Sequence, residues 1–152
     1  MIKVFWDNPY QCTLKTKVVS VNRDWLVFEK TIAYSFAGGQ ESDKAFINGI
    51  PILNSIIEGS LILYQLPEDH GICVGSEVEM TIDWTRRSRL MRLHFAAELI
   101  LEIVTQKFGY EKIGAHISET KSRIDFISSE TIAQNYQKSY LHIMILSRKI
   151  SL

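Results

Sequence analysis

The sequence predicts an α+β fold in which antiparallel strands precede one long helix. Over residues 1–82, short apolar stretches alternate with polar turns, a pattern typical of five to seven short strands. From about residue 84, apolar residues recur at three- and four-residue steps, the period of a helix. We therefore expect a small β-barrel or sandwich over residues 1–84, packed on an α+β domain over residues 85–152, because no Pro- or Ser-rich linker separates them.

Turn signals divide the first part into its strands. Strands are expected at residues 2–6, 11–21, 25–31, 45–47, 50–53, 56–66 and 78–82. Asn48-Gly49 is a strong hairpin signal, because both residues tolerate positive φ. The loop of residues 34–43 contains Gly38 and Gly39, which permit close backbone approaches that other residues cannot make.

The predicted helix has clear ends and one apolar face. Asp83 or Thr85 can cap its start, and Gly109 is placed to end it in a left-handed conformation. Its buried face is expected to carry Leu93, Ala97, Ile100 and Val104. Two strands around residues 115–118 and 122–127 follow, joined by a polar turn at residues 119–121. Ser129 then looks like the N-cap of a last helix that runs to about residue 147.

Composition narrows the class of protein. The chain of 152 residues is 46% apolar and has no uncharged apolar run of membrane-spanning length and no signal-peptide pattern at its start. We therefore expect a cytoplasmic protein with no membrane partner. Cys12 and Cys73 lack CxxC spacing and are expected to be reduced thiols. Seventeen basic and seventeen acidic residues balance, so any nucleic-acid surface must be a local patch.

Such a patch could lie at the start of the long helix. Cations there oppose the helix dipole, so helix stability alone explains poorly the four arginines Arg86, Arg87, Arg89 and Arg92. Contact with phosphates and pairing with local acids are two interpretations of equal weight. Lys121 and Arg123 could extend the patch, although Arg123 and Asp125 share a strand face, where an ion pair is the simpler account.

Three segments, in order, resemble one family. They are AYSFAGGQESD at residues 33–43 with Ile47-Asn48-Gly49, DWTRRSRLMRLH at residues 83–94, and GAHI at 114–117 with RIDF at 123–126. Together they are similar to the editing domain of alanyl-tRNA synthetases and to the AlaX-type trans-editing proteins. The resemblance implies a β-barrel of the translation-protein type followed by an α+β editing domain. It also implies hydrolysis of serine or glycine wrongly attached to alanine tRNA.

The family's zinc site has only a partial counterpart in this sequence. The resemblance places Gly38, Gly39 and Gln40 at the substrate pocket, and it implies zinc held by an HxxxH pair and a later CxxxH pair. His94 stands at the first ligand position, Glu98 replaces the second histidine, and no CxxxH occurs. Carboxylates can bind zinc, but two ligands make an incomplete metal site. A helix histidine bonded to Glu98 is the alternative interpretation of His94.

Two functions follow from these observations. The first is an aminoacyl-tRNA deacylase or a degenerate relative of one, in which water attacks the ester. The second is a non-catalytic tRNA- or protein-binding module that kept the fold and lost the zinc site. A homo-oligomer in which two chains complete one site is a third interpretation.

Overall fold

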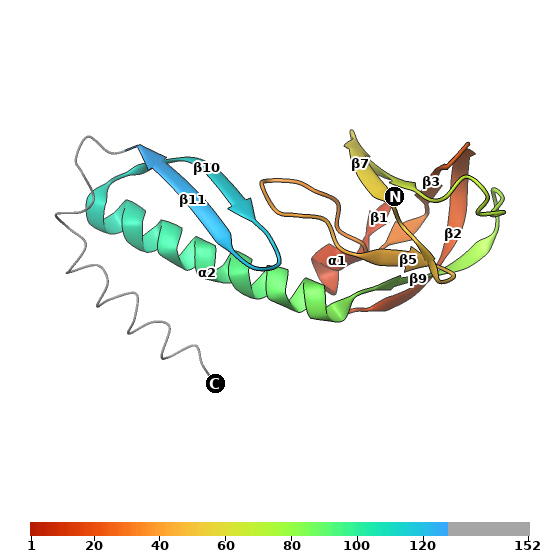
Figure 1. Ribbon diagram of the computed structural model, residues 1–152, viewed down its shortest axis with the longest axis horizontal. Coiled ribbons are helices and arrows are strands. Elements are labelled where there is room, and N and C mark those ends of the chain that lie inside the picture. Colours follow the sequence, from red (N-terminus) through yellow and green to blue (C-terminus); the bar gives the residue numbers. More distant parts are fainter. Residues whose placement is uncertain (128–152) are drawn as a thin grey trace.

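The computed structural model describes residues 1–127 and has an α+β architecture (Figure 1). Its strand-rich body contains a seven-stranded antiparallel sheet in the order β6-β5-β9-β2-β3-β8-β7. In chain order these strands are β2 (Thr13–Asn22), β3 (Trp25–Phe28), β5 (Ala45–Ile47), β6 (Ile50–Pro51), β7 (Asn54–Glu58), β8 (Leu61–Gln65) and β9 (Glu77–Ile82). A short parallel pair, β1 (Ile2–Lys3) and β4 (Lys30–Thr31), and the single-turn helix α1 (Val4–Asp7) complete the body.

The sheet curls because its two edge strands are neighbours in the chain. Only Ile52 and Leu53 separate β6 from β7. The Ile52 N–H donates to the Ala45 carbonyl in β5 over 2.9 Å, and the Leu53 N–H donates to the Gln65 carbonyl in β8 over 2.8 Å. The long strand β2 pairs with β9 through its first half and with β3 through its second, with a register shift where it bends. Both edges therefore meet at one short segment.

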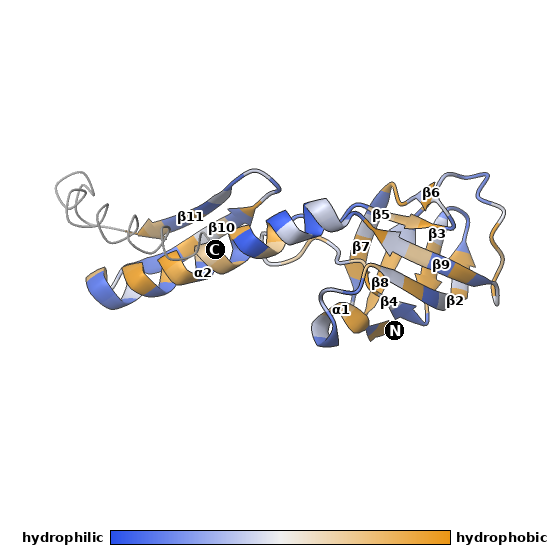
Figure 2. Cartoon of the chain, turned by 90° about the horizontal axis from the view of Figure 1, so that it is seen from below, coloured by the Kyte–Doolittle hydropathy of each residue, from blue (hydrophilic) through white to orange (hydrophobic). Residues whose placement is uncertain are grey.

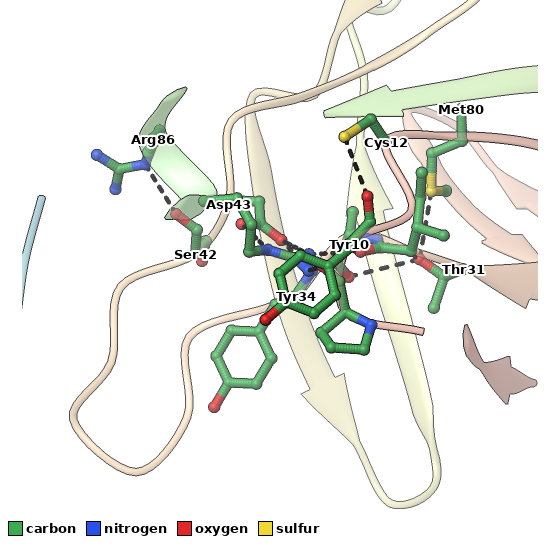
Figure 3. Close-up of polar contacts among 12 residues, drawn as sticks. Tyr10, Cys12, Thr31, Tyr34, Ser42, Asp43, Met80 and Arg86 are labelled. Carbon is green, nitrogen blue, oxygen red and sulfur yellow. Dashed lines mark hydrogen bonds and ion pairs between the residues drawn. The ribbon is translucent and has the colours of Figure 1, made fainter. Parts of the chain in front are cut away.

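The core of the body lies inside this curl. Its largest fully buried side chains include Phe28, Leu26, Ile47 and Tyr64. The Tyr64 hydroxyl donates to the Ala33 carbonyl over 2.6 Å and lies 2.7 Å from the Thr31 hydroxyl, so its polar atom is satisfied. Burial raises the pKa of Tyr64, which keeps the phenol neutral. Thr31 also reaches the sulfur of Met80 (Figure 3).

The hairpin predicted at Asn48-Gly49 is confirmed. Asn48 has φ 49° and Gly49 has φ 82°, so both central residues of the β5–β6 turn are left-handed. The Asn48 side chain also accepts the Glu79 N–H over 2.8 Å, which fixes the turn beside β9.

Three strand predictions in the body were wrong. Residues 25–31 divide into β3 and β4, which belong to different sheets. Residues 2–6 do not form one strand: only Ile2–Lys3 pairs, and Val4–Asp7 turns into α1, whose Phe5 is buried in the core. In a continuous strand, Phe5 and Trp6 would point to opposite faces. The ladder between β1 and β4 has only two residues on each side, and it ends before Phe5. Residues 56–66 likewise split into the β7–β8 hairpin, because Gly59 has φ 58° and reverses the chain.

The second part of the molecule is helix α2 (Trp84–Phe108) with the antiparallel hairpin β10 (Glu111–Ile117) and β11 (Ser122–Ile127) lying along it (Figure 1). Both predicted caps are confirmed. The Asp83 carboxylate accepts the Arg86 N–H over 3.1 Å, and Gly109 has φ 67°.

The buried face of α2 differs in part from the prediction. Leu90 and Ala97 are its buried apolar residues, whereas Ile100 and Val104 are half-buried. The hairpin packs Ile117 and Ile124 against the first half of α2, so burial declines further along the helix. Figure 2 shows the helix changing from hydrophilic first turns to a more hydrophobic middle.

Two further predictions are not tested by the structure of residues 1–127. The helix predicted over residues 129–147 lies outside the described part of the chain, and the division into domains at residues 84 and 85 stays a prediction. Within residues 1–127, no helix combines the length and apolarity needed to cross a membrane.

Candidate functional site

The loop of residues 34–43, here called the glycine-pair loop, leaves the sheet body and extends toward the β10–β11 hairpin (Figure 1). Its two ends are tied together. The Tyr34 N–H donates to the Asp43 carboxylate over 2.6 Å, and the Asp43 N–H donates to the Tyr34 carbonyl over 3.0 Å. A further bond joins the Phe36 N–H to the Ser42 hydroxyl over 2.9 Å. These hydrogen bonds therefore hold the loop in a defined conformation.

The far end of the glycine-pair loop docks on β10. The Ile117 N–H donates to the Gly39 carbonyl over 2.8 Å, and the Glu41 N–H donates to the Ile117 carbonyl over 2.9 Å. Gly39 has φ 83°, and a Cβ there would lie 2.2 Å from the Ala115 carbonyl oxygen. Gly38 also has positive φ, 59°, but a Cβ there would have no neighbour within 4 Å. Only position 39 therefore needs glycine for close approach.

This docking brings Gln40 against His94. The Gln40 side chain is buried, and its Oε1 lies 2.5 Å from Nδ1 of His94. Because an amide oxygen only accepts hydrogen bonds, this contact places the proton on Nδ1. The other ring nitrogen, Nε2, then faces Glu98, whose Oε1 is 3.6 Å away. The structure thus brings together the predicted pocket residue Gln40 and both predicted metal ligands.

The described residues do not form a zinc site by themselves. His94 Nε2 and the Glu98 carboxylate could both contact one cation, yet a structural or catalytic zinc needs three or four protein ligands. Within residues 1–127, no group of three or more His, Cys, Asp or Glu side chains is placed to hold a metal. Cys12 and Cys73 are free thiols in the sheet body, and His142 lies outside the described residues.

Arg87 joins the start of α2 to the base of the glycine-pair loop. Its guanidinium is 4% exposed and forms a two-pronged ion pair with Asp43, whose carboxylate is 1% exposed. It also donates to the carbonyls of Pro9, over 3.0 Å, and Ile32, over 2.6 Å. Almost no surface of the Arg87 guanidinium is left for a tRNA phosphate.

Arg86 and Arg89 converge on Glu119 at the hairpin tip. Arg86 Nη1 lies 2.9 Å from Glu119 Oε2, and Arg89 Nη1 lies 2.7 Å from Glu119 Oε1. Arg86 also pairs with Glu41 over 2.8 Å and donates to the Ser42 carbonyl over 3.1 Å (Figure 3). Burial alone would lower the pKa of Arg86, but the hydrogen bonds to Glu119 and Glu41 outweigh it and raise the pKa. Hydrogen bonds from both arginines lower the pKa of Glu119.

The other predicted tRNA-binding residues are exposed. Arg92 and Lys121 lie on the surface, and Arg123 pairs with Asp125 over 3.2 Å, as the strand pattern indicated. The pairing of Arg86 and Arg89 with Glu119 was not predicted, because no sequence spacing links residues about thirty positions apart. Asp43 could have been found, since it ends the motif that contains the glycine pair.

A cleft of about 620 Å³ opens between the glycine-pair loop, the start of α2 and the hairpin tip. This volume is in the range of small-molecule sites. The lining residues are Phe36, Glu41, Ser42, Asp43, Lys44, Ile52, Asp83, Arg86 and Glu119. The predicted pocket residues Gly38, Gly39 and Gln40 and the predicted ligands His94 and Glu98 are not among the residues that line this cleft.

Comparisons with known proteins agree with the motifs. No family model matches the chain. It is 28% identical over 134 residues to the alanyl-tRNA editing protein AlaX-M of Pyrococcus horikoshii, covering 86% of this chain and 62% of that protein. It is 29% identical over 130 residues to AlaX-M of Saccharolobus solfataricus, covering 82% of this chain and 55% of that protein. The chain is a homologue of alanyl-tRNA editing proteins.

The chain also matches part of the much larger alanine–tRNA ligases. It is 31% identical over 137 residues to the alanine–tRNA ligase of Staphylothermus marinus, covering 86% of this chain and 15% of the ligase. The chain thus spans just over half the length of the AlaX-M relatives and a small part of the ligase. The family resemblance drawn from the three segments is confirmed.

Proposed function

We propose that this chain is an aminoacyl-tRNA editing protein that binds alanine tRNA and hydrolyses the ester of wrongly attached serine or glycine. The curled sheet is proposed to be a β-barrel of the translation-protein type. The observation that carries the proposal is the contact between Gln40 and His94, 2.5 Å apart, because it joins two of the family-like segments in one place. The editing proteins among the chain's homologues support the same conclusion.

The residues described can orient a water and a substrate ester. Gln40 holds the His94 ring by its Nδ1 and so directs Nε2 toward Glu98. A water near both groups could pass a proton to the Nε2 lone pair or to the Glu98 carboxylate as it attacks the ester carbonyl, and the same group could return that proton to the tRNA ribose oxygen as the acyl C–O bond breaks. A zinc ion, when bound, would polarise that carbonyl, and His94 and Glu98 are the donors that residues 1–127 place there for it. Further donors would have to come from outside residues 1–127.

Deacylation of mischarged tRNA tests the proposal. The full chain, incubated with alanine tRNA that carries serine, should release serine, and Gln40→Ala and His94→Ala should each slow the release. Glu58→Gln is the matched control, because Glu58 is exposed on β7 in the sheet body. Elemental analysis of the same preparation gives its zinc content. Absence of release, with and without added zinc, would refute hydrolysis.

A non-catalytic tRNA-binding module is the second candidate. The specific observation in its favour is that, within residues 1–127, no group of three or more His, Cys, Asp or Glu side chains is placed to hold a metal. Binding of tRNA that weakens as salt rises, without serine release, would support this module. An affinity that does not change with salt concentration would indicate a protein partner. Sedimentation that shows only monomer would exclude a site completed by two chains.

A further inference from the structure

The hairpin tip places one carboxylate between two guanidinium groups. Arg86 Nη1 and Arg89 Nη1 each reach a different oxygen of Glu119, at 2.9 Å and 2.7 Å. Both arginines belong to the first turns of α2, where helix electrostatics disfavours cations. A phosphodiester also offers two unesterified oxygens on one centre, and arginine pairs bind such oxygens through parallel N–H donors. The carboxylate thus presents to the two arginines a negative charge and a pair of oxygens, as a phosphodiester would.

We propose that Glu119 occupies a phosphodiester-binding site, and that a phosphate of tRNA displaces it from Arg86 and Arg89. The inference rests on the proposed function, because tRNA is the ligand that the proposed function supplies. Glu119 therefore acts as a built-in competitor that weakens binding to other anions. A tRNA that docks correctly elsewhere on the surface overcomes this competition.

The turn can release Glu119 without unfolding. The Ser118 N–H donates to the Lys121 carbonyl over 2.9 Å, and the Ser118 hydroxyl bonds both the carbonyl and the N–H of Lys121. These bonds close the turn without any help from the Glu119 side chain. Arg86 also keeps its place when Glu119 leaves, since Glu41 and the Ser42 carbonyl still hold it.

The local charges explain why displacement is needed. With Glu119 seated, the charged side chains that line the cleft are four carboxylates and two cations: Glu41, Asp43, Asp83 and Glu119 against Lys44 and Arg86. Arg87, which pairs with Asp43, and Arg89, which pairs with Glu119, offset two of these carboxylates, so the seated Glu119 leaves the tip with no net positive charge to attract a phosphate. Once Glu119 turns away, Arg89, whose side chain is 56% exposed, becomes free, and the exposed Lys121 lies two residues from the tip. The balance at the tip then shifts toward the cations.

Binding of uncharged alanine tRNA to the full chain tests the proposal. Glu119→Gln keeps the length of the side chain and removes its charge, so we expect about fivefold tighter binding at low salt, with a smaller gain as salt rises. The matched control is Glu58→Gln, which removes an exposed carboxylate from the sheet body. The control should change affinity less than twofold, roughly the effect of one screened charge.

A second variant links the gain to the arginines. In an Arg89→Gln background, Glu119→Gln should give no gain, and Arg89→Gln alone should weaken binding. The proposal is overturned if Glu119→Gln binds no tighter than Glu58→Gln, if the gain persists without Arg89, or if neither the native chain nor Glu119→Gln binds. Should Glu119→Gln fail to fold, unchanged binding by Arg89→Gln would be decisive against it. Uncharged tRNA separates this result from hydrolysis: a chain that releases no serine can still show the gain.

Discussion

The sheet body and the helix–hairpin part of the molecule are stabilised in different ways. Buried apolar side chains from most of its strands form one core in the body. In the described part of the second region, the buried cluster consists of Leu90, Ala97 and Ile117 alone. What holds this region to the body is mostly polar: the Arg87–Asp43 ion pair, the bonds between the glycine-pair loop and β10, and the Gln40–His94 contact, beside one aromatic contact between Tyr10 and Trp84.

This difference shows which contacts require accurately placed atoms. A hydrophobic core tolerates small shifts, whereas paired charges and backbone bonds across a 2.8 Å contact do not. The residues that resemble the editing family take part in these polar contacts. The candidate site is therefore assembled by polar contacts at the junction of the two regions, and changes to these contacts are the way to test it.

The largest effect is expected at the buried ion pair. Arg87→Met leaves the Asp43 carboxylate uncompensated at 1% exposure, so the free energy of unfolding should fall by about 3–5 kcal/mol. Urea unfolding followed by circular dichroism measures this change. Arg92→Met, at an exposed position of the same helix, is the control and should change stability by less than about 0.5 kcal/mol. Similar values for both variants would contradict a polar junction.

A smaller effect is expected where the loop meets β10. Gly39→Ala combines a positive φ with a Cβ 2.2 Å from the Ala115 carbonyl, so the loop should detach from the strand at a cost of about 1–3 kcal/mol. Hydrogen exchange should show lost protection at the amides of Ile117 and Glu41. Gly38→Ala, with the same sign of φ but open space around it, should leave both amides protected.

Removing the Gln40 side chain should cost still less. Gln40→Ala breaks one hydrogen bond to a half-exposed ring, which amounts to about 1 kcal/mol. The informative measurement is the nitrogen NMR spectrum of His94, in which the proton now held on Nδ1 should become free to move between both ring nitrogens. An unchanged tautomer would mean that Gln40 does not orient the ring.

The smallest effect concerns acid stability at the hairpin tip. Hydrogen bonds from Arg86 and Arg89 lower the pKa of Glu119 below its ordinary value of 4.5. The pairing therefore stabilises the fold fully above that value, and this contribution is lost as pH falls through the lowered pKa. Glu119→Gln should make stability less dependent on pH in that acidic range. Thermal melts between neutral and acidic pH compare the two chains, and parallel curves would contradict the pairing.

The sequence predicted local structure well where a local rule applied. Asn48-Gly49, Asp83 and Gly109 each specify a turn or a cap through their own backbone or side chain, and all three were confirmed. Residues 4–7 were misjudged, because a short apolar run suits a strand or a helical turn equally, and the burial of Phe5 decides between them.

The candidate site was only partly predictable, for a physical reason. Gln40 and His94 were marked by family-like motifs, but their contact is a tertiary fact. Arg86 and Arg89 were noticed because they conflict with the helix dipole, while their partner Glu119 lies in a turn that no periodicity connects to the helix. Long-range ion pairs leave no spacing signal in a single sequence.

The way in which the two ends of the sheet are joined affects how copies of this chain can associate. Ile52 and Leu53 bond to strands on both sides, so the two ends of the sheet meet at this segment. Among the described strands, β7 still pairs on one side only, with β8, and β11 pairs on one side only, with β10. If the protein aggregates at high concentration, growth should begin at one of these two edges, and a lysine or proline introduced at the edge that grows should prevent it.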